Sequence, residues 1–359
     1  MSTSPLKDLL VLETASVLAG PAVGMFFAEL GARVVKVENK RAGGDVTRRW
    51  KLPSEDPASP LSAYFSSVNW GKEHLLLDLT NATDREQFDE LLRTADVLIT
   101  NHLAEDAVKL GLARERLRAL NPKLVTGHIR GFADDDARTA YDVVLQAETG
   151  YISMTGTDAD HPAKLPVAMI DVLAAHQLKE GLLVALLQRE RTGRGAHVEV
   201  ALDQAALAGL VNQASNYLMA GHVAAPLGTL HPNIAPYGEL FTCADGGQLI
   251  LAVGGDAQFK DLCTILGREA LTGDARFADN RSRVMHRTEM AALLAPAIAQ
   301  HPRKPLLDRL IAAGVPAGAV RTLDEVLSIP TAQALVREQM IEGVPTRRIS
   351  GNVFRIEEV

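Results

Sequence analysis

Short apolar runs alternate with amphipathic segments along the first third of the chain. Residues 8–14 (DLLVLET) and 32–38 (ARVVKVE) have the apolar pattern of buried strands. Residues 19–31 (AGPAVGMFFAELG), between them, have the pattern of a helix, and Gly31 stands where a helix commonly ends. This order predicts a strand–helix–strand unit whose two strands lie parallel.

The same alternation continues to about residue 132. Further elements are predicted as strands at 72–80, 96–101 and 124–132 and as helices at 84–95 and 113–121, the first of these helices opening at Asp84. Strands that alternate regularly with helices pack as a parallel sheet with helices on both faces. The first part of the chain is therefore expected to form a doubly wound, mostly parallel α/β sheet.

The rest of the chain has a different pattern. It is helical from residue 141 to about 193, and a stretch rich in glycine, proline and histidine begins at residue 221. A hairpin is predicted to turn at Asp245-Gly246-Gly247, before helices at about 256–313. These segments predict a smaller α+β domain. The expected division is a large domain at 1–200, a linker at 201–227, the small domain at 228–328 and a C-terminal segment at 329–359 that returns to the large domain.

The composition narrows the range of functions. Only 4% of the 359 residues are aromatic whereas 47% are hydrophobic, so Ala, Val, Leu and Ile must fill most of the core. The formal net charge of -7, without any stretch rich in Lys and Arg, excludes nucleic acid as a partner. No apolar run reaches the roughly 18 residues of a membrane span, and the N-terminal segment lacks the apolar core of a signal peptide. We therefore expect a cytoplasmic protein that does not bind membranes.

Metal and dinucleotide sites are both disfavoured by residue spacing. Cys243 and Cys263 are the only cysteines and the ten histidines are scattered, so no metal site is predicted. The first strand–helix–strand unit imitates a dinucleotide fingerprint, but Gly20 and Gly24 do not form the G-x-G-x-x-G pattern that lets a backbone approach a pyrophosphate. NAD binding is therefore not expected.

Asp171 interrupts an apolar stretch (LPVAMIDVLAAHQ, residues 165–177) just before a long helical segment. An Asp at such a junction can cap the helix, which contributes about 1 kcal/mol. A carboxylate held ionised at a helix N-terminus is also a nucleophile towards activated acyl groups. The local sequence leaves both roles open, and the two are compatible.

Other polar residues are equally ambiguous when each is taken alone. Tyr141 and Asp142 precede a helix that is expected to close at Gly150, which fits a simple N-cap. Four cations could each meet a phosphate group or only solvent, namely Lys40, Arg41, Lys72 and Lys109.

Ten segments, in order and at similar spacing, resemble the family III CoA-transferases, also called the CaiB/BaiF group. The resemblance covers about residues 6–330, and its strength lies in the succession of segments. These are LETASVLAGPAVGMFFAELGARVVKVE, GGDVTRRW, YFSSVNWGKEHLLLDL, ADVLITN, KLGL, NPKLV, YDVVLQAETGYISMTG, QRERTGRGAHVEVAL, HPNIAPYGELFT and RFADNRSRV.

The resemblance implies an enzyme that moves CoA between an acyl-CoA donor and a carboxylic acid acceptor. It also implies a Rossmann-like large domain and a dimer of interlocked chains, with the active site between the large domain of one chain and the small domain of the other. Asp171 matches the family's catalytic aspartate by its place in the order of segments, and would form aspartyl anhydride and aspartyl-CoA thioester intermediates. No cofactor is implied, because the CoA thioester is a substrate. The residues that the resemblance places along the CoA cleft are Val17, Leu18, Ala19, Lys40 or Arg41, Lys72, Lys109, Tyr141 and Asp142.

Two alternatives remain open from the sequence. The family also contains α-methylacyl-CoA racemases, which abstract an α-proton with an aspartate and a histidine, and the chain length fits these enzymes. Tyr141 stands where that histidine is expected, and a tyrosine with an unperturbed pKa of about 10 is a poor base near neutral pH. His128 is interpreted as a structural strand residue. The other alternative is an acyl-CoA-binding protein without turnover, in which Asp171 only caps its helix.

Overall fold

The computed structural model of the chain describes residues 4–134 and 137–357. It divides into two compact units, each with its own hydrophobic core. Unit 1 consists of the described residues of Met1–Tyr151, Lys164–Val223 and Pro330–Val359, and unit 2 consists of those of Ile152–Ala163 and Ala224–Ile329.

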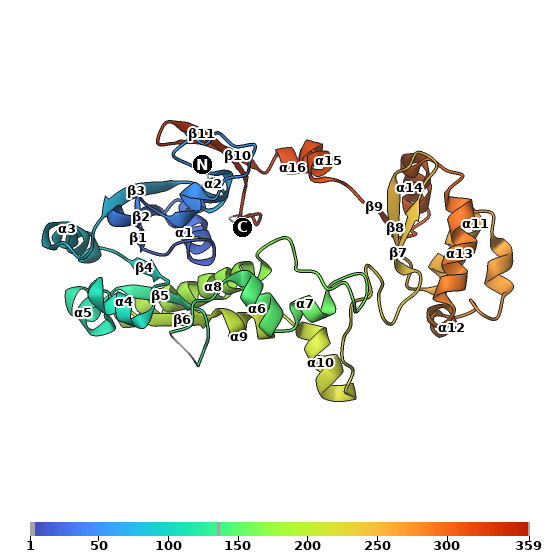
Figure 1. Ribbon diagram of the computed structural model, residues 1–359, viewed down its shortest axis with the longest axis horizontal. Coiled ribbons are helices and arrows are strands. Elements are labelled where there is room, and N and C mark those ends of the chain that lie inside the picture. The colour runs from blue at the N-terminus through green and yellow to red at the C-terminus, as the bar shows by residue number, and fades with distance from the viewer. Residues whose placement is uncertain (1–3, 135–136, 358–359) are drawn as a thin grey trace. The chain divides into compact units, whose positions relative to one another are not determined.

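Unit 1 is built on a six-stranded sheet in which all neighbouring strands are parallel (Figure 1). The strand order is β3-β2-β1-β4-β5-β6. These strands are β1 (Leu10–Glu13), β2 (Arg33–Asn39), β3 (Lys72–Leu77), β4 (Val97–Thr100), β5 (Val125–Arg130) and β6 (His197–Ala201). The chain turns towards opposite edges of the sheet after β1 and after β4, so a crevice is expected between the loops that follow these two strands.

Helices cover both faces of this sheet, so the prediction of a doubly wound α/β fold is confirmed. One face packs against α1, α8 and α9, and the other packs against α3 and α5. The helices of unit 1 are α1 (Ala19–Glu29), α2 (Ala63–Val68), α3 (Ala82–Leu92), α4 (Ala104–Lys109), α5 (Arg114–Leu120), α6 (Asp142–Glu148), α8 (Met169–Thr192), α9 (Leu202–Ala208), α10 (Val211–Ala220) and α16 (Pro330–Gln333), with the 3-10 turns η1 (Lys40–Ala42) and η2 (Val46–Arg49). The short helix α7 (Tyr151–Met154) spans the boundary between the two units.

The long helix α8 lies close to the sheet because a glycine makes room for it. A Cβ at Gly127 in β5 would stand only 3.1 Å from a methyl group of Leu182. The helix ends at Gly193, whose φ of 69° glycine adopts without strain and whose N–H donates to the carbonyl of Arg189 at 2.7 Å. The contact at Gly127 brings α8, the helix that carries Asp171, close to β5.

Two predicted boundaries differ from the structure. The helix expected to open at Asp84 begins at Ala82, because the side chain of Asn81 accepts the N–H groups of Thr83 and Asp84 and so caps α3. Most of the expected linker at 201–227 is helical and belongs to unit 1. The reason is the apolar face of α9, where Leu202, Ala205 and Ala206 are buried in the core of unit 1.

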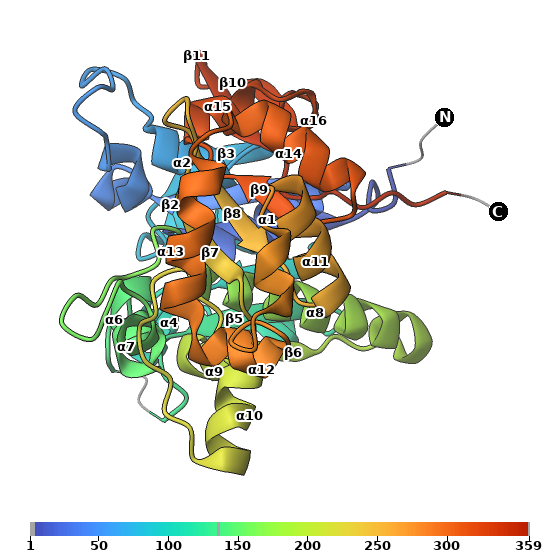
Figure 2. The same ribbon diagram turned by 90° about the vertical axis from the view of Figure 1, so that its right-hand side faces the viewer.

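Unit 2 is the smaller α+β domain that the sequence predicts. Its sheet has three antiparallel strands, and α13 packs against β7 and α14 against β9 (Figure 2). The expected hairpin turns at Asp245-Gly246-Gly247, where the N–H of Cys243 donates to the carbonyl of Gly247 at 2.8 Å. The elements are β7 (Tyr237–Thr242), β8 (Gln248–Ala252), β9 (Ala317–Ala319), α11 (Asp256–Ile265), η3 (Glu269–Gly273), α12 (Asn280–Met285), α13 (Arg287–Ile298), α14 (Arg303–Ala312) and α15 (Leu323–Ser328).

The chain returns from unit 2 to unit 1 and ends there with a hairpin of β10 (Val336–Ile341) and β11 (Val344–Ile349). The hairpin is fastened to unit 1 by polar and apolar contacts. The side chain of Gln339 accepts the N–H of Gly71 at 2.7 Å, and Ile341 is buried in a small cluster with Phe65. Among the helices that the structure describes, none has the length and apolar character required to cross a bilayer.

Candidate active site

A cleft of about 600 Å³ opens in unit 1 at the carboxyl ends of β1, β4 and β5. Its walls include Ser16–Ala19 after β1, Asn101–Ala104 after β4 and Gly131 after β5. This is the crevice where open parallel sheets commonly bind their ligands. Of the residues predicted from the sequence, the cleft brings together Val17, Leu18, Ala19, Tyr141, Asp142 and Asp171.

Asp171 is the third residue of α8 and is only 9% exposed. Burial, with the nearby charge of Asp142 as the second cause, raises the pKa of the Asp171 carboxyl to about 7. We expected the helix N-terminus to keep this carboxylate ionised, but the dipole contributes only about 0.3–1 kcal/mol at most sites, which is less than the cost of burying a charge. The carboxyl group of Asp171 is therefore partly protonated and partly ionised near neutral pH.

Asp142 provides the cap that the sequence left open for Asp171. Its Oδ2 accepts the backbone N–H of Ile170 at 2.7 Å and that of Asp171 at 3.2 Å, so it satisfies two free donors at the start of α8. Ala168, the residue at the N-cap position, forms no side-chain cap. Because a residue from α6 caps the helix, the carboxyl group of Asp171 is not needed for that purpose.

Val17 holds the cleft-lining turn after β1 in an unusual backbone conformation. Its φ is 73°, in the left-handed region that a β-branched residue rarely adopts. Such a conformation costs about 1–3 kcal/mol and persists only where neighbouring groups impose it. Leu18 and Ala19 follow directly and begin α1, whose N-terminus faces the same cleft.

Lys72 is buried inside unit 1, whereas a ligand of a CoA phosphate would have to reach the cleft or the surface. Its side chain is fully buried, and its ammonium donates to both carboxylate oxygens of Glu13, to the carbonyl of Pro21 and to Asn69, at 2.8–2.9 Å. The buried Glu13 needs a positive partner, since an unpaired charge in the interior is strongly destabilising. Lys72 therefore belongs to the core of unit 1 and does not line the cleft.

The other three predicted cations are surface residues. The side chains of Lys40, Arg41 and Lys109 are 61%, 70% and 63% exposed, and each lies 3.1–4.0 Å from a surface carboxylate. They do not line the cleft. Their charges are solvated, as the sequence allowed, and their assignment to the CoA phosphates stays a prediction.

The cations that line the cleft are Arg114, Arg130 and Arg138, which sequence reasoning did not select. Arg138 stacks over the ring of Phe132 at 3.8 Å and pairs with Glu148. Arg138 lies three residues before Tyr141 in the sequence, and its contacts with Phe132 and Glu148 hold its guanidinium at the cleft.

His128 bears on the racemase alternative, and Tyr64 lies within the electrostatic influence of Asp171. His128 lines the cleft and lies 2.8 Å through Nδ1 from the hydroxyl of Thr100, and burial lowers the pKa of His128 to about 4. Such an imidazole is too weak a base for α-proton abstraction near neutral pH. Burial, together with the charges of Asp171 and Asp142, raises the pKa of Tyr64 to about 12, so Tyr64 stays a neutral hydroxyl in the field of the site.

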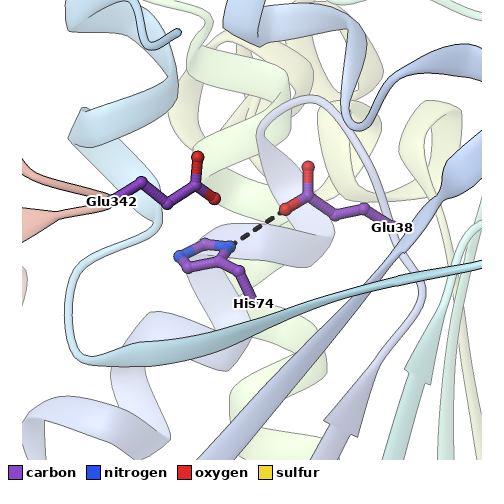
Figure 3. A group of neighbouring side chains, drawn as sticks. All are labelled: Glu38, His74 and Glu342. Carbon is purple, nitrogen blue, oxygen red and sulfur yellow. Dashed lines mark hydrogen bonds and ion pairs between the residues drawn. The ribbon is translucent and has the colours of Figure 1, made fainter.

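A second cluster of titratable groups lies outside the cleft. Figure 3 shows Glu38, His74 and Glu342 pointing toward one another, with possible metal-ligating atoms within 4.8 Å. The guanidinium of Arg48, however, donates to Glu38 at 2.6 and 2.7 Å and to Glu342 at 2.9 and 3.1 Å. Although burial opposes it, the hydrogen bonds from Arg48 and His74 hold the pKa of the Glu38 carboxyl far below its ordinary value. Arg48 thus pairs with both carboxylates, and the cluster is an ion-pair network that fastens the β10–β11 hairpin.

We expect Glu342→Gln to lower the free energy of unfolding by about 1 kcal/mol, because it removes the charge paired with Arg48 but keeps the side-chain shape. Urea denaturation measures this difference. Glu338→Gln, on the same hairpin, is the matched control, since its pair with Arg347 is exposed and should contribute almost nothing. Loss of wild-type stability on adding a chelator would contradict the ion-pair interpretation.

Comparison with known proteins identifies the family. A family model described as CoA-transferase family III matches residues 6–356. The chain belongs to the family III CoA-transferases. It is 39% identical to the succinate–glutarate CoA-transferase of Agrobacterium fabrum over 336 residues, which are 92% of this chain and 83% of that protein. It is 33% identical to the acetyl-CoA:oxalate CoA-transferase of Acetobacter aceti over 343 residues, or 94% and 86% of the two chains.

Solved structures agree with this assignment. The crystal structure of a CaiB/BaiF family protein from Brucella suis matches with a TM-score of 0.85 and 36% identity, covering 98% of this chain and 92% of that one. The resemblance inferred from the ordered segments is therefore confirmed, as is the expectation of a CoA-transferase enzyme. A family III CoA-transferase acts on acyl-CoA and carboxylate substrates.

Proposed function

We propose that this CoA-transferase works by covalent catalysis, with Asp171 as the nucleophile. The observation that carries the proposal is a buried carboxyl group that lines the cleft, has a pKa of about 7 and is relieved of helix capping by Asp142. A carboxylate that is basic and poorly solvated is a stronger nucleophile than one that is acidic and fully hydrated.

The proposed reaction conserves the energy of the thioester. An oxygen of ionised Asp171 attacks the thioester carbonyl of the donor, the C–S bond breaks, and CoA leaves as a thiolate from a mixed anhydride. The thiolate attacks the aspartyl carbonyl, the anhydride C–O bond breaks, and the donor acid leaves as a carboxylate. The acceptor carboxylate then displaces the thiolate to form a second anhydride. Attack of the thiolate on the acceptor's carbonyl gives the new acyl-CoA and restores Asp171.

We propose a short dicarboxylic acid as the acceptor and a dicarboxylic acyl-CoA as the donor. Relatives named succinate–glutarate and acetyl-CoA:oxalate CoA-transferase support the acceptor, and the first of these names supports the donor. Incubating the protein with succinyl-CoA and a panel of labelled acids, followed by hydroxylamine trapping and peptide mass spectrometry, tests both proposals. Transfer with a hydroxamate at Asp171 is expected. Exchange of an α-proton without transfer would favour a racemase, and CoA binding with neither reaction would favour a binding protein.

We also propose that the protein acts as an interlocked homodimer. Support comes from α10, a helix of ten residues none of which is buried, and in which Leu218 and Met219 are 80% and 88% exposed. An apolar helix surface of this kind is typical of an interface. Light scattering after size-exclusion chromatography is expected to give twice the chain mass of 38.6 kDa, and a monomer would contradict the proposal.

We propose Arg138 as a further ligand of the CoA phosphates, because its side chain lines the cleft. We expect Arg138→Gln to raise the KM for acyl-CoA about tenfold with little change in kcat, because one charge-assisted contact to phosphate is lost in substrate and transition state alike. Lys40→Gln is the matched control and should leave KM unchanged. The opposite result would restore the assignment made from sequence.

A further inference from the structure

Side chains from other parts of unit 1 hold the turn that leads from β1 into the cleft. Lys36 in β2 donates its ammonium to the carbonyl of Ala15 at 2.8 Å. Asn101, after β4, accepts the N–H of Ser16 at 3.1 Å and donates to its carbonyl at 2.9 Å. Ala15 and Ser16 are thus both hydrogen-bonded to side chains that are distant in sequence.

The third residue, Val17, is held by Asp45. Oδ2 of Asp45 accepts the N–H of Val17 at 3.3 Å and lies 3.1 Å from the ammonium of Lys36. Oδ1 accepts both the N–H and the hydroxyl of Thr47, at 3.0 and 2.8 Å. Asp45 is only 5% exposed, so its contacts with Lys36 and Thr47 are buried, while its contact with Val17 is partly buried at the edge of the cleft. Lys36 and Thr47 fix the position of the Asp45 carboxylate, which accepts the N–H of the strained residue Val17.

We propose that Asp45 is a positioning residue for CoA binding, which keeps Val17 in the left-handed conformation and so gives the turn Ser16–Ala19 the shape that lines the cleft. In dinucleotide-binding folds, glycines supply the special backbone conformations at this place after β1. This chain has no glycine between Ser16 and Ala19. The carboxylate of Asp45 therefore stabilises a backbone conformation that dinucleotide-binding folds obtain from glycine. The inference rests on the proposed function in one respect, namely that CoA occupies this cleft.

The affinity for CoA tests the proposal directly. In Asp45→Ala and Asp45→Asn, the dissociation constant of CoA by calorimetry and the KM for acyl-CoA should both rise about tenfold, since the turn is free to leave the strained conformation. Because Asp45 touches no reacting atom, kcat should change by roughly twofold or less. Asp45→Asn keeps the shape of the side chain, so its affinity for CoA tests the proposal if Asp45→Ala does not fold.

Asp89 offers a matched control. Like Asp45, it is an aspartate of unit 1 that is 5% exposed and ion-paired, in this case with Arg116. It does not line the cleft. Asp89→Asn should lower the melting temperature without changing the affinity for CoA. If folded Asp45 variants bind CoA as tightly as the wild type, or if Asp89→Asn weakens CoA binding as much, the positioning role is refuted.

Replacement of Val17 supplies a readout that a merely structural role would not move. Glycine adopts a φ of 73° without strain, so it has less need of the carboxylate. In the Val17→Gly background, Asp45→Asn should therefore weaken CoA binding by only about twofold, instead of about tenfold. An undiminished effect of Asp45→Asn in that background would overturn the inference.

Failure of the proposed function gives a different result. If the wild-type protein binds no CoA, the assignment of the cleft is wrong, whatever the Asp45 variants do. If the wild type binds and transfers CoA, and the Asp45 variants bind CoA as tightly as the wild type, the cleft assignment stands and the positioning role is refuted.

Discussion

Asp171→Ala is expected to abolish CoA transfer, lowering kcat by about four orders of magnitude or more while CoA still binds. The magnitude follows from the loss of a covalent nucleophile, since a water molecule in the same place would hydrolyse the thioester instead of conserving it. A coupled assay of acyl-CoA formation measures the loss, and calorimetry with CoA shows whether the cleft survives.

Asp171→Asn separates a chemical effect from a folding defect. Since the carboxyl has a pKa near 3.9 in the unfolded chain and about 7 in the fold, the folded protein binds an extra proton between these values. Stability from this group is therefore present at low pH and is lost as the pH rises towards about 7. At pH 8 the uncharged Asp171→Asn variant should melt at a higher temperature than the wild type, yet be inactive. Asp160→Asn, at an exposed aspartate, should match the wild type in both properties.

The rate of transfer should depend on pH through the same carboxyl. Only the ionised form attacks, so kcat/KM should rise about tenfold per unit below pH 7, reach half its maximum near pH 7, and level off above about pH 8. A pH profile with a donor whose own groups do not titrate in this range measures the midpoint. A midpoint near 4 would contradict the burial that the structure gives to Asp171.

Asp142→Asn tests the second cause of the shifted pKa. The variant removes the charge that raises the pKa of Asp171, but its amide oxygen can still accept the N–H groups of Ile170 and Asp171. The midpoint of the profile should move to lower pH, although burial, the larger cause, keeps it above the ordinary value. Asp142→Ala removes the cap as well and should also lower the melting temperature by destabilising the start of α8.

The fold could be predicted from the sequence wherever local pattern decides it. Apolar runs and a helix ending near Gly31 located β1, α1 and β2 within two residues. The helix α4 was missed because its six residues, AEDAVK, carry too little periodicity to detect. The β10–β11 hairpin was missed as well, because its turn at Glu342 and Gly343 lacks the usual Asn-Gly or Asp-Gly signal.

The site was less accessible to sequence reasoning, because its residues act on partners far away in the chain. Asp142 caps a helix that begins 27 positions later, so no local pattern could take the role of cap away from Asp171. Lys72 was expected near phosphate, but its place is decided by Glu13, which lies 59 residues earlier. Charge alone does not distinguish a cation that reaches a ligand from one that neutralises a buried acid.

The contact between Arg48 and Glu342 joins residues that are 294 positions apart, and it has a consequence for how the chain acquires its structure during synthesis. The ribosome makes all six strands of the large sheet and the whole of unit 2 before the hairpin that completes unit 1 exists. Until then Phe65 and the charged group of Arg48 lack their last covering. The large unit therefore stays incomplete, with apolar and charged groups exposed to chaperones or to premature association, until the hairpin has been synthesised.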